Sequence, residues 1–402
     1  MGETGELPLE GLRVLDLASL FAGPIITTLM ADFGADVIKV EHPRGDGLRS
    51  MGWHRKGESL WWAFVSRNKR AVTLDLGKPE GGEVLRELAG TADVLVENFR
   101  PGTMERWGIG WEDLRAVNPR LIMVRTTGFG QSGPYSTRPG FGTLAEAMSG
   151  YCHINGYPDG PPTLPPFALG DGVAALFGTF ATMFAIYARD VRATGVGQVI
   201  DLSILEPLFW LLGPQATVYD QLGVVQDRTG NRAPFTAPRN MYQAADGTWL
   251  ALSASSQSIA ERVMRLVGRP DIVDEPWFGN HTGRLEHQDE LDEIISGWIA
   301  ERSPDEVIEA FTAAEAAIAP VYSIADIFED PHYQARGTIG TYEHPTLGRF
   351  RMQDIVPRLS ETPGAIRFPG RPLGADNEEV FRKELGHTPN ELRQWRDLGI
   401  IT

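Results

Sequence analysis

One carboxylate in this sequence is distinguished by its neighbours. Asp171 lies between Gly170 and Gly172, directly before the long uncharged run GVAALFGTFATMFAIYA (172–188). If that run is a helix, its dipole would favour an ionised carboxylate at this end, and the glycines would leave room for a bulky electrophile. An apolar setting would also strip water from a nucleophilic carboxylate. An ordinary N-cap aspartate fits the same position, so the residue pattern alone leaves both interpretations open.

Other catalytic patterns have little support. The segment GFGQSG (128–133) matches G-x-G-x-x-G, but Pro134 and Pro139 follow it, so it predicts a mobile loop after a strand rather than a dinucleotide-binding helix start. The sequence contains neither G-x-x-x-x-G-K-[ST] nor G-x-S-x-G, and its eight histidines lack zinc-ligand spacing. We therefore expect no metal site, and an NAD-dependent oxidoreductase is the least favoured alternative.

Composition excludes several partners. The 402 residues include 37 Lys plus Arg and 53 Asp plus Glu, a net charge of −16, so neither nucleic acid nor an anionic membrane surface is expected to bind. A single cysteine, Cys152, cannot form an internal disulfide and predicts a reducing, cytoplasmic compartment. The N-terminus shows no signal-peptide pattern. The apolar run 172–188 is at the lower limit for a bilayer span, and its charged borders favour a buried helix.

The elements that must position Asp171 alternate along the chain. Short β-branched or leucine-rich runs are separated by stretches of helical character, such as 24–33, whose apolar residues recur at spacings of three and four. This alternation predicts an α/β fold with a mainly parallel sheet wrapped by helices. The predicted strands are 12–17, 35–41, 71–76, 92–99 and 120–127.

The pattern changes after about residue 205. A hairpin at 242–254, turning on Asp246-Gly247, and amphipathic helices at 258–268 and 303–314 indicate a smaller α+β domain. The segment 355–379 is rich in Pro and Gly and predicts an extended strap, followed by two helices. The expected division is 1–205 for the N-terminal part of a large domain, 206–224 for a linker, 225–325 for the small domain and 326–402 for a return that completes the large one.

Several segments of the chain form a set that can be compared with known families. They are GLRVLDLASLFAGP (11–24), MADFGADVIKVEHPRGD (30–46), NKRAVTLDL (68–76), ADVLVENFRPGTMERWGIG (92–110), NPRLIMVRTTGFGQSGP (118–134), ALGDGVAALFG (168–178), TGNRAPFTAPRNMYQAADG (229–247) and PLGADNEEVFRKELG (372–386). In these segments the sequence resembles the class III CoA-transferase family, which includes formyl-CoA transferases, carnitine CoA-transferases and α-methylacyl-CoA racemases. The resemblance covers nearly the whole chain and implies a Rossmann-like large domain built from both chain ends, a smaller α+β domain, and a homodimer of interlocked rings.

By this resemblance, Asp171 matches the family's catalytic aspartate, which forms aspartyl anhydride and aspartyl-CoA thioester intermediates. No cofactor is implied as permanently bound, because CoA thioesters are substrates. Arg100 and Arg106 suit CoA phosphates, although Arg106 equally fits a solvated helix position. Gly142 and Arg239 are substrate candidates, with Arg239 as an anchor for a second carboxylate. The resemblance points to CoA contacts at Phe21, Ala22, His42, Leu74, Asp75, Asn98, Phe99, Arg100, Arg106, Gly140 and Phe141.

Two departures from the family pattern bear on the substrate. Phe141 stands where the racemases carry a catalytic histidine, and Phe141-Gly142 replaces the Tyr-Glu of formyl-CoA transferases. We therefore expect an acyl-CoA:carboxylate CoA-transferase that uses succinyl-CoA or another dicarboxylate donor and a carboxylic acid acceptor. The alternatives are an α-methylacyl-CoA racemase-like enzyme and a noncatalytic CoA-binding subunit of a heteromeric transferase.

Overall fold

A computed structural model describes residues 7–402, and the first six residues of the N-terminal segment lie outside it. The chain forms two compact units, each described by itself. The first contains the chain up to Tyr151, Leu164–Ala216 and Arg336–Thr402, and the second contains Cys152–Thr163 and Thr217–Ala335. The segments 152–163 and 326–335 thus belong to the second unit, whereas the division expected from sequence assigns both to the large domain.

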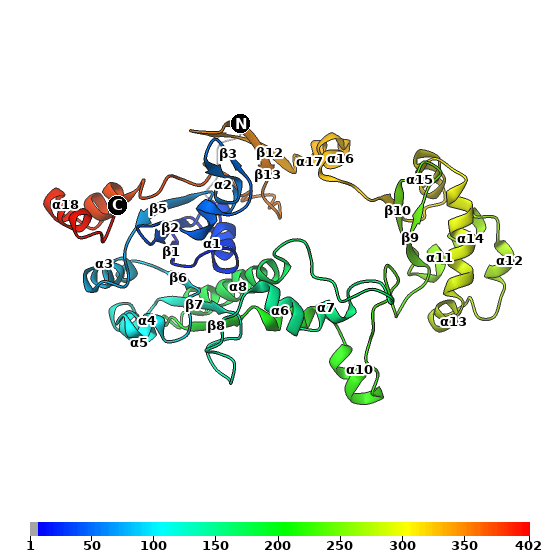
Figure 1. Ribbon diagram of the computed structural model, residues 1–402, viewed down its shortest axis with the longest axis horizontal. Helices are drawn as coiled ribbons and strands as arrows, with labels where there is room; N and C mark the ends of the chain where they lie inside the picture. Colours follow the sequence, from blue (N-terminus) through cyan, green and yellow to red (C-terminus); the bar gives the residue numbers. More distant parts are fainter. Residues whose placement is uncertain (1–6) are drawn as a thin grey trace. The chain divides into compact units, whose positions relative to one another are not determined.

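The first unit is built on a six-stranded sheet in which all strands run parallel, in the order β5-β2-β1-β6-β7-β8 (Figure 1). The five strands predicted from sequence are confirmed. The edge strand β8 was not predicted, because only its last two residues are buried. The strands are β1 (Arg13–Asp16), β2 (Asp36–Glu41), β5 (Lys69–Thr73), β6 (Val94–Glu97), β7 (Ile122–Thr127) and β8 (Val199–Ser203).

Helices cover both faces of this sheet, so its strands are apolar on both sides. Successive residues of β1 show the alternation: Val14 packs in one core with α1 and α8, and Leu15 packs in another with α3, α5 and the C-terminal helices. The helical elements are α1 (Ala22–Asp32), η1 (Gly47–Ser50), α2 (Leu60–Val65), α3 (Pro79–Gly90), α4 (Thr103–Arg106), α5 (Trp111–Val117), α6 (Gly142–Met148), α8 (Leu169–Ile186), η2 (Tyr187–Val191), α9 (Leu205–Leu211), η3 (Glu378–Glu384) and α18 (Pro389–Asp397).

The end of the chain returns to the first unit. Residues 355–376 contain no regular helix or strand, as the Pro and Gly content predicted, but the chain is helical from residue 377, before the predicted end of the strap at 379. At the end of this strap, Asp376 and Asn377 accept hydrogen bonds from the backbone amides of Ala71 and Thr73 on the edge strand β5, at 2.7 and 2.9 Å. Phe381 and Leu392, both fully buried, complete the core under that strand.

A buried ion network lies at the carboxyl end of β1. The Asp16 carboxylate is 2.9 Å from the Lys69 ammonium and 3.6 Å from that of Lys39, which in turn lies 3.0 Å from Asp46. Burial opposes the charge of Asp16, but the two lysines outweigh it and hold the Asp16 pKa below its ordinary value. Asp16 also accepts a hydrogen bond from the Ala18 amide at 3.1 Å, so the network fixes the loop that leaves β1.

Two further two-stranded sheets belong to the first unit, and the second unit has its own antiparallel sheet, ordered β11-β10-β9. The predicted hairpin is confirmed as β9 and β10, with helices packed around a core that includes Phe278 and Phe311. The small sheets are β3 (His54–Arg55) with β4 (Glu58–Ser59) and β12 (Ile339–His344) with β13 (Gly348–Gln353). The second unit contains β9 (Arg239–Gln243), β10 (Trp249–Ser253), β11 (Ile318–Pro320), α11 (Gln257–Leu266), α12 (Pro270–Val273), α13 (His281–Glu286), α14 (Gln288–Ala300), α15 (Pro304–Ala313) and α16 (Ile324–Glu329). Three helices lie where the chain passes between units: α7 (Tyr151–Ile154), α10 (Gln215–Leu222) and α17 (Pro331–Arg336).

Helix α8 is long and apolar enough to cross a membrane by length and composition alone. One face of it, including Ala174 and Ala175, packs into the first unit, as expected for a core helix. The other face exposes Leu176, Phe180 and Phe184, so the prediction of a buried helix is correct for only one side.

Candidate active site

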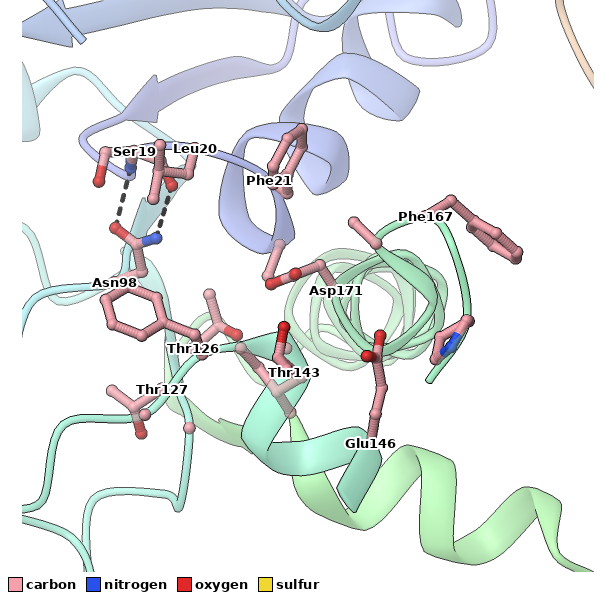
Figure 2. A pocket seen from close by; sticks show the side chains of 18 of the residues that line it. Ser19, Leu20, Phe21, Asn98, Thr126, Thr127, Thr143, Glu146, Phe167 and Asp171 are labelled. Atoms are coloured by element: carbon pink, nitrogen blue, oxygen red, sulfur yellow. Dashed lines mark hydrogen bonds between the residues drawn. The ribbon is translucent and has the colours of Figure 1, made fainter. Parts of the chain in front are cut away.

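A cavity of about 460 Å³ opens where the carboxyl ends of β1, β6 and β7 meet the beginning of α8 (Figure 2). Ligands of parallel α/β sheets bind at this edge because loops and helix N-termini converge there. Apart from two carboxylates, the described residues that line it are apolar or uncharged. They are Ser19, Leu20, Phe21, Ala22, Met51, Asn98, Thr126, Thr127, Gly128, Gly140, Phe141, Gly142, Thr143, Glu146, Leu164, Pro165, Pro166, Phe167, Ala168, Asp171 and Ile204.

Asp171 is the third residue of α8, whose N-cap is Ala168. The N-cap interpretation of Asp171 is therefore wrong, and the residue lies inside the first turn. Figure 2 shows its carboxylate leaving that turn into the space between Phe21 and Thr143. At this position the amide groups of the first turn point the positive end of the helix toward the carboxylate, which interacts with its own backbone amide.

Helix α6 packs against this turn and places two residues of one face beside Asp171. A Cβ atom added to Gly142 would lie 2.3 Å from Asp171 Oδ2, so only glycine leaves room for the carboxylate. One turn later, Glu146 is buried and accepts a hydrogen bond from the Gly170 amide at 2.9 Å. The predicted role of glycine near Asp171 thus falls partly on Gly142, whereas a Cβ atom on Gly172 would meet no atom within 4 Å.

The cavity makes the Asp171 carboxylate more basic than usual. Burial and the nearby Glu146 charge raise the pKa of Asp171 from 3.8 to about 6. Among residues 7–402, no Lys, Arg or His lines the cavity to offset these effects. At neutral pH Asp171 is therefore a poorly hydrated carboxylate of raised basicity, which suits a nucleophile that attacks a carbonyl carbon.

A second cavity of about 510 Å³ lies along the same edge, over the ends of β2 and β5, and shares Ser19 with the first. The imidazole of His42 lines it, with Nε2 3.9 Å from Asp75 Oδ1 and Nδ1 accepting the Arg44 amide at 3.0 Å. Phe99 and Trp107 form an edge-to-face pair on its other side, with ring centroids 5.2 Å apart. The cavity combines aromatic surface with polar groups, as an extended ligand requires.

The two cavities gather most of the residues predicted from sequence. Phe21, Ala22, Asn98, Gly140, Phe141, Gly142 and Asp171 line the first, and His42, Leu74, Asp75 and Phe99 line the second. Three predicted arginines line neither of them. Arg100 is exposed, Arg106 is exposed and donates to Thr103 of its own helix at 2.9 Å, and Arg239 belongs to the second unit, where it donates to the Asn231 carbonyl at 3.0 Å.

Asn98 has a local structural task. Its side-chain oxygen accepts the Ser19 amide at 2.9 Å, and its Nδ2 donates to the Ser19 carbonyl at 2.7 Å (Figure 2). This pair of bonds ties the end of β6 to the loop after β1. The wall of the cavity between Ser19 and Phe21 is therefore held by both Asn98 and the buried Asp16 network.

Sequence reasoning missed Glu146 and the threonines that end β7. The hydroxyl groups of Thr126 and Thr127 have no hydrogen-bond partner within the described chain and belong to residues that line the cavity. Paired threonines at the end of a predicted strand could have indicated them. The G-x-G-x-x-G match has a packing role instead, since a Cβ atom on Gly128 would lie 2.6 Å from the Gly140 Cα atom. No helix begins at the match, as predicted, and the next one starts at Gly142.

The raised pKa of Asp171 predicts a cost in stability. The folded protein binds a proton at Asp171 more tightly than the unfolded chain, so the cost is absent below pH 3.8, grows as pH rises through about 6 and is complete above that value. Asp171→Asn removes the charge at nearly constant shape and should stabilise the fold at about pH 8, on the order of 2 kcal/mol. Thermal unfolding of both proteins measures this. An equal or lower Tm for the variant at about pH 8 would contradict the raised pKa of Asp171. A gain in Tm that does not shrink toward about pH 4 would contradict it as well.

Comparison with known proteins gives a consistent identity. CoA-transferase family III matches residues 9–377. A succinyl-CoA–D-citramalate CoA-transferase from Chloroflexus aurantiacus is 42% identical over 98% of each chain, and the β subunit of a succinyl-CoA–L-malate CoA-transferase from the same organism is 40% identical over 100% of each. The crystal structure of a CaiB/BaiF family protein from Brucella suis covers 94% of this chain and 100% of its own, with a TM-score of 0.82 and 28% identity. The chain belongs to CoA-transferase family III.

Proposed function

We propose that this protein transfers CoA from succinyl-CoA to a second carboxylic acid, and that Asp171 carries the CoA between them. The observation that carries the proposal is a partly buried carboxylate in the first turn of α8 that faces a cavity with no cation among its described lining residues, with a pKa raised to about 6. Two relatives named for succinyl-CoA and for citramalate or malate support this donor and favour a dicarboxylic or hydroxydicarboxylic acceptor.

The reaction proceeds through two covalent forms of Asp171. An Asp171 oxygen attacks the thioester carbonyl of succinyl-CoA, the C–S bond breaks, and CoA leaves as a thiolate, which gives a mixed anhydride of Asp171 and succinate. The thiolate then attacks the Asp171 carbonyl carbon and releases succinate, which leaves an aspartyl-CoA thioester. The acceptor carboxylate reverses these steps, so the acceptor departs as its CoA thioester and Asp171 regains its carboxylate. Thioester bond energy is kept throughout because every step exchanges one acyl bond for another.

The cavities fit the two halves of such a substrate. Anhydrides hydrolyse, so the reacting atoms need apolar surroundings, which Phe21 would provide beside Asp171. Phe141 and Phe167 also line the cavity, with rings that are mostly exposed. The second cavity would take the CoA moiety, with His42, Asp75 and Phe99 as contacts. Arg100 and Arg106 would bind its phosphates. The role of Arg239 as an anchor for a second carboxylate stays a prediction from the sequence.

Two alternative functions, a racemase and a noncatalytic CoA-binding subunit, can be distinguished from CoA transfer. A racemase needs an acid or base on each face of the α-carbon, and no histidine lines the Asp171 cavity among the described residues. Deuterium entering the α-position of an acyl-CoA from solvent would identify it. A noncatalytic subunit would bind CoA but exchange nothing when purified alone.

An exchange assay tests the proposed function. Purified protein incubated with succinyl-CoA and a panel of dicarboxylic acids should form new CoA thioesters without net loss of thioester, measured by mass spectrometry. Asp171→Asn and Asp171→Ala should lose this exchange by at least about a thousandfold, because both remove the carboxylate that carries the CoA. Circular dichroism checks that both variants remain folded. Exchange by either variant at the original rate would rule out the role of Asp171.

Gly142 allows a test of the space around the nucleophile. Gly142→Ala would place a methyl group 2.3 Å from Asp171 Oδ2, so the carboxylate must move, and kcat should fall on the order of a hundredfold. Gly297→Ala is the matched control, because it is also a helical Gly→Ala change and its Cβ atom meets nothing within 4 Å. Similar activity in both variants would show that the contact at Gly142 does not limit catalysis.

The proposal includes a homodimer of interlocked rings, in the cytoplasm, where a chain with one cysteine suits the reducing conditions. Support comes from the exposed aromatic face of α8 and α9, where Phe184 and Trp210 are 66% and 69% exposed. Light scattering should give about twice the chain mass of 44.2 kDa, and Phe184→Glu should weaken the dimer. A monomeric wild-type protein at micromolar concentration would contradict this part of the proposal.

A further inference from the structure

Glu146 is a buried carboxylate for which the transfer steps above have no use. It is 3% exposed, lies one turn after Gly142 on α6 and faces the beginning of α8. Figure 2 shows it beside the turn that carries Asp171. Burying a carboxylate costs free energy unless its hydrogen bonds and charge are used, so its position here needs a reason.

The first reason is geometric. The Gly170 amide belongs to the first turn of α8, where backbone donors have no helical acceptor, and Glu146 accepts it at 2.9 Å. This bond fixes the peptide from which the next residue, Asp171, extends. On the opposite side, the missing side chain of Gly142 defines the space for Asp171 Oδ2. Helix α6 therefore holds the nucleophile from two sides through residues one turn apart.

The second reason is electrostatic. Glu146 is the one other ionisable group among the described residues that line the cavity. On the elements packed around the first turn of α8, the charged side chains interact with groups other than Asp171. Glu206 of α9 accepts the Ser203 hydroxyl at 2.7 Å, Arg125 of β7 is bound by Glu97 and Glu105, and the segment 164–168 is uncharged.

Repulsion between two carboxylates ends when one of them becomes neutral. Protonation neutralises Asp171, and so does acylation, because an anhydride or a thioester carries no charge at that carbonyl. The Glu146 charge therefore raises the free energy of the unmodified carboxylate relative to its acylated forms.

We propose that Glu146 is a positioning residue that fixes the Asp171 turn through Gly170 and whose charge favours the acylated forms of Asp171 over the free carboxylate. The inference rests on the proposed function of Asp171 as the CoA carrier and adds a role that this function does not itself require.

Two substitutions separate the geometric and electrostatic roles. Glu146→Gln keeps an oxygen that can accept the Gly170 amide but removes the charge, whereas Glu146→Ala removes both. In the wild type, kcat/KM should fall below about pH 6 as Asp171 becomes protonated, and this limb should lie at lower pH in both variants. The plateau kcat should fall severalfold in Glu146→Gln and at least tenfold further in Glu146→Ala, where the turn is no longer held.

The acylation equilibrium gives a second readout. At a fixed ratio of succinyl-CoA to succinate, intact-protein mass spectrometry measures the ratio of the Asp171–CoA thioester to free enzyme. Glu146→Gln should lower this ratio about tenfold for each pH unit by which its rate limb moves down, because the same repulsion governs both. An unchanged limb and an unchanged ratio would overturn the electrostatic role. Equal plateau rates in Glu146→Gln and Glu146→Ala would overturn the positioning role.

A stability measurement keeps the inference testable apart from transfer activity. Asp171→Asn should raise the Tm at about pH 8 less in the Glu146→Gln background than in the wild type, because the repulsion it relieves is already absent. Equal gains in both backgrounds would overturn the electrostatic coupling. If the purified wild type exchanges no CoA, the proposed function fails, while this double-mutant cycle still decides whether Glu146 acts on Asp171.

Discussion

The site depends on one constraint: a carboxylate held in a mostly uncharged cavity, with no cation among the described residues that line it. Asp16 and Asp171 lie at the same edge of one sheet and show how environment separates their roles. Two lysines surround Asp16 and keep its pKa low, so this charge serves structure. Burial and Glu146 raise the pKa of Asp171, so its charge costs stability and is available for chemistry. We interpret the buried ion network around Asp16 as the rigid support that makes an unpaired carboxylate at Asp171 possible.

Other contacts within the first unit fix the position of Asp171 and of the cavity wall beside it. The Asp16 network and Asn98 fix the loop that carries Phe21, and the packing of α6 on α8 fixes Asp171. Because neighbouring parallel strands end at the same edge, the two cavities form side by side and share Ser19. A long thioester could then lie along the sheet edge with its reactive carbonyl at Asp171. The same sheet topology therefore positions both the Asp171 carboxylate and the second cavity, in which the CoA part of a substrate would bind.

Sequence alone predicted much of this, and the failures have physical reasons. Alternating apolar runs identified five of the six parallel strands, because strands covered on both faces are strongly apolar. The strand β8 was missed because three of its five residues are not buried. The sequence around Asp171 left its local position open, since a carboxylate before an apolar run suits a cap and a first-turn position equally. Glu146 could not be found, because its contact with Gly170 joins residues 24 apart that meet only when α6 packs on α8.

Following an oxygen atom tests the central claim most directly. If Asp171 exchanges acyl groups through an anhydride, each turnover transfers one oxygen from the acceptor carboxylate to the Asp171 side chain. The protein should be incubated with succinyl-CoA and an acceptor acid labelled with heavy oxygen in its carboxylates, then digested, and the peptide containing Asp171 analysed by mass spectrometry. The account predicts heavy oxygen in the Asp171 carboxylate. New CoA thioester formed while the label remains entirely in the acids and their thioesters would contradict it.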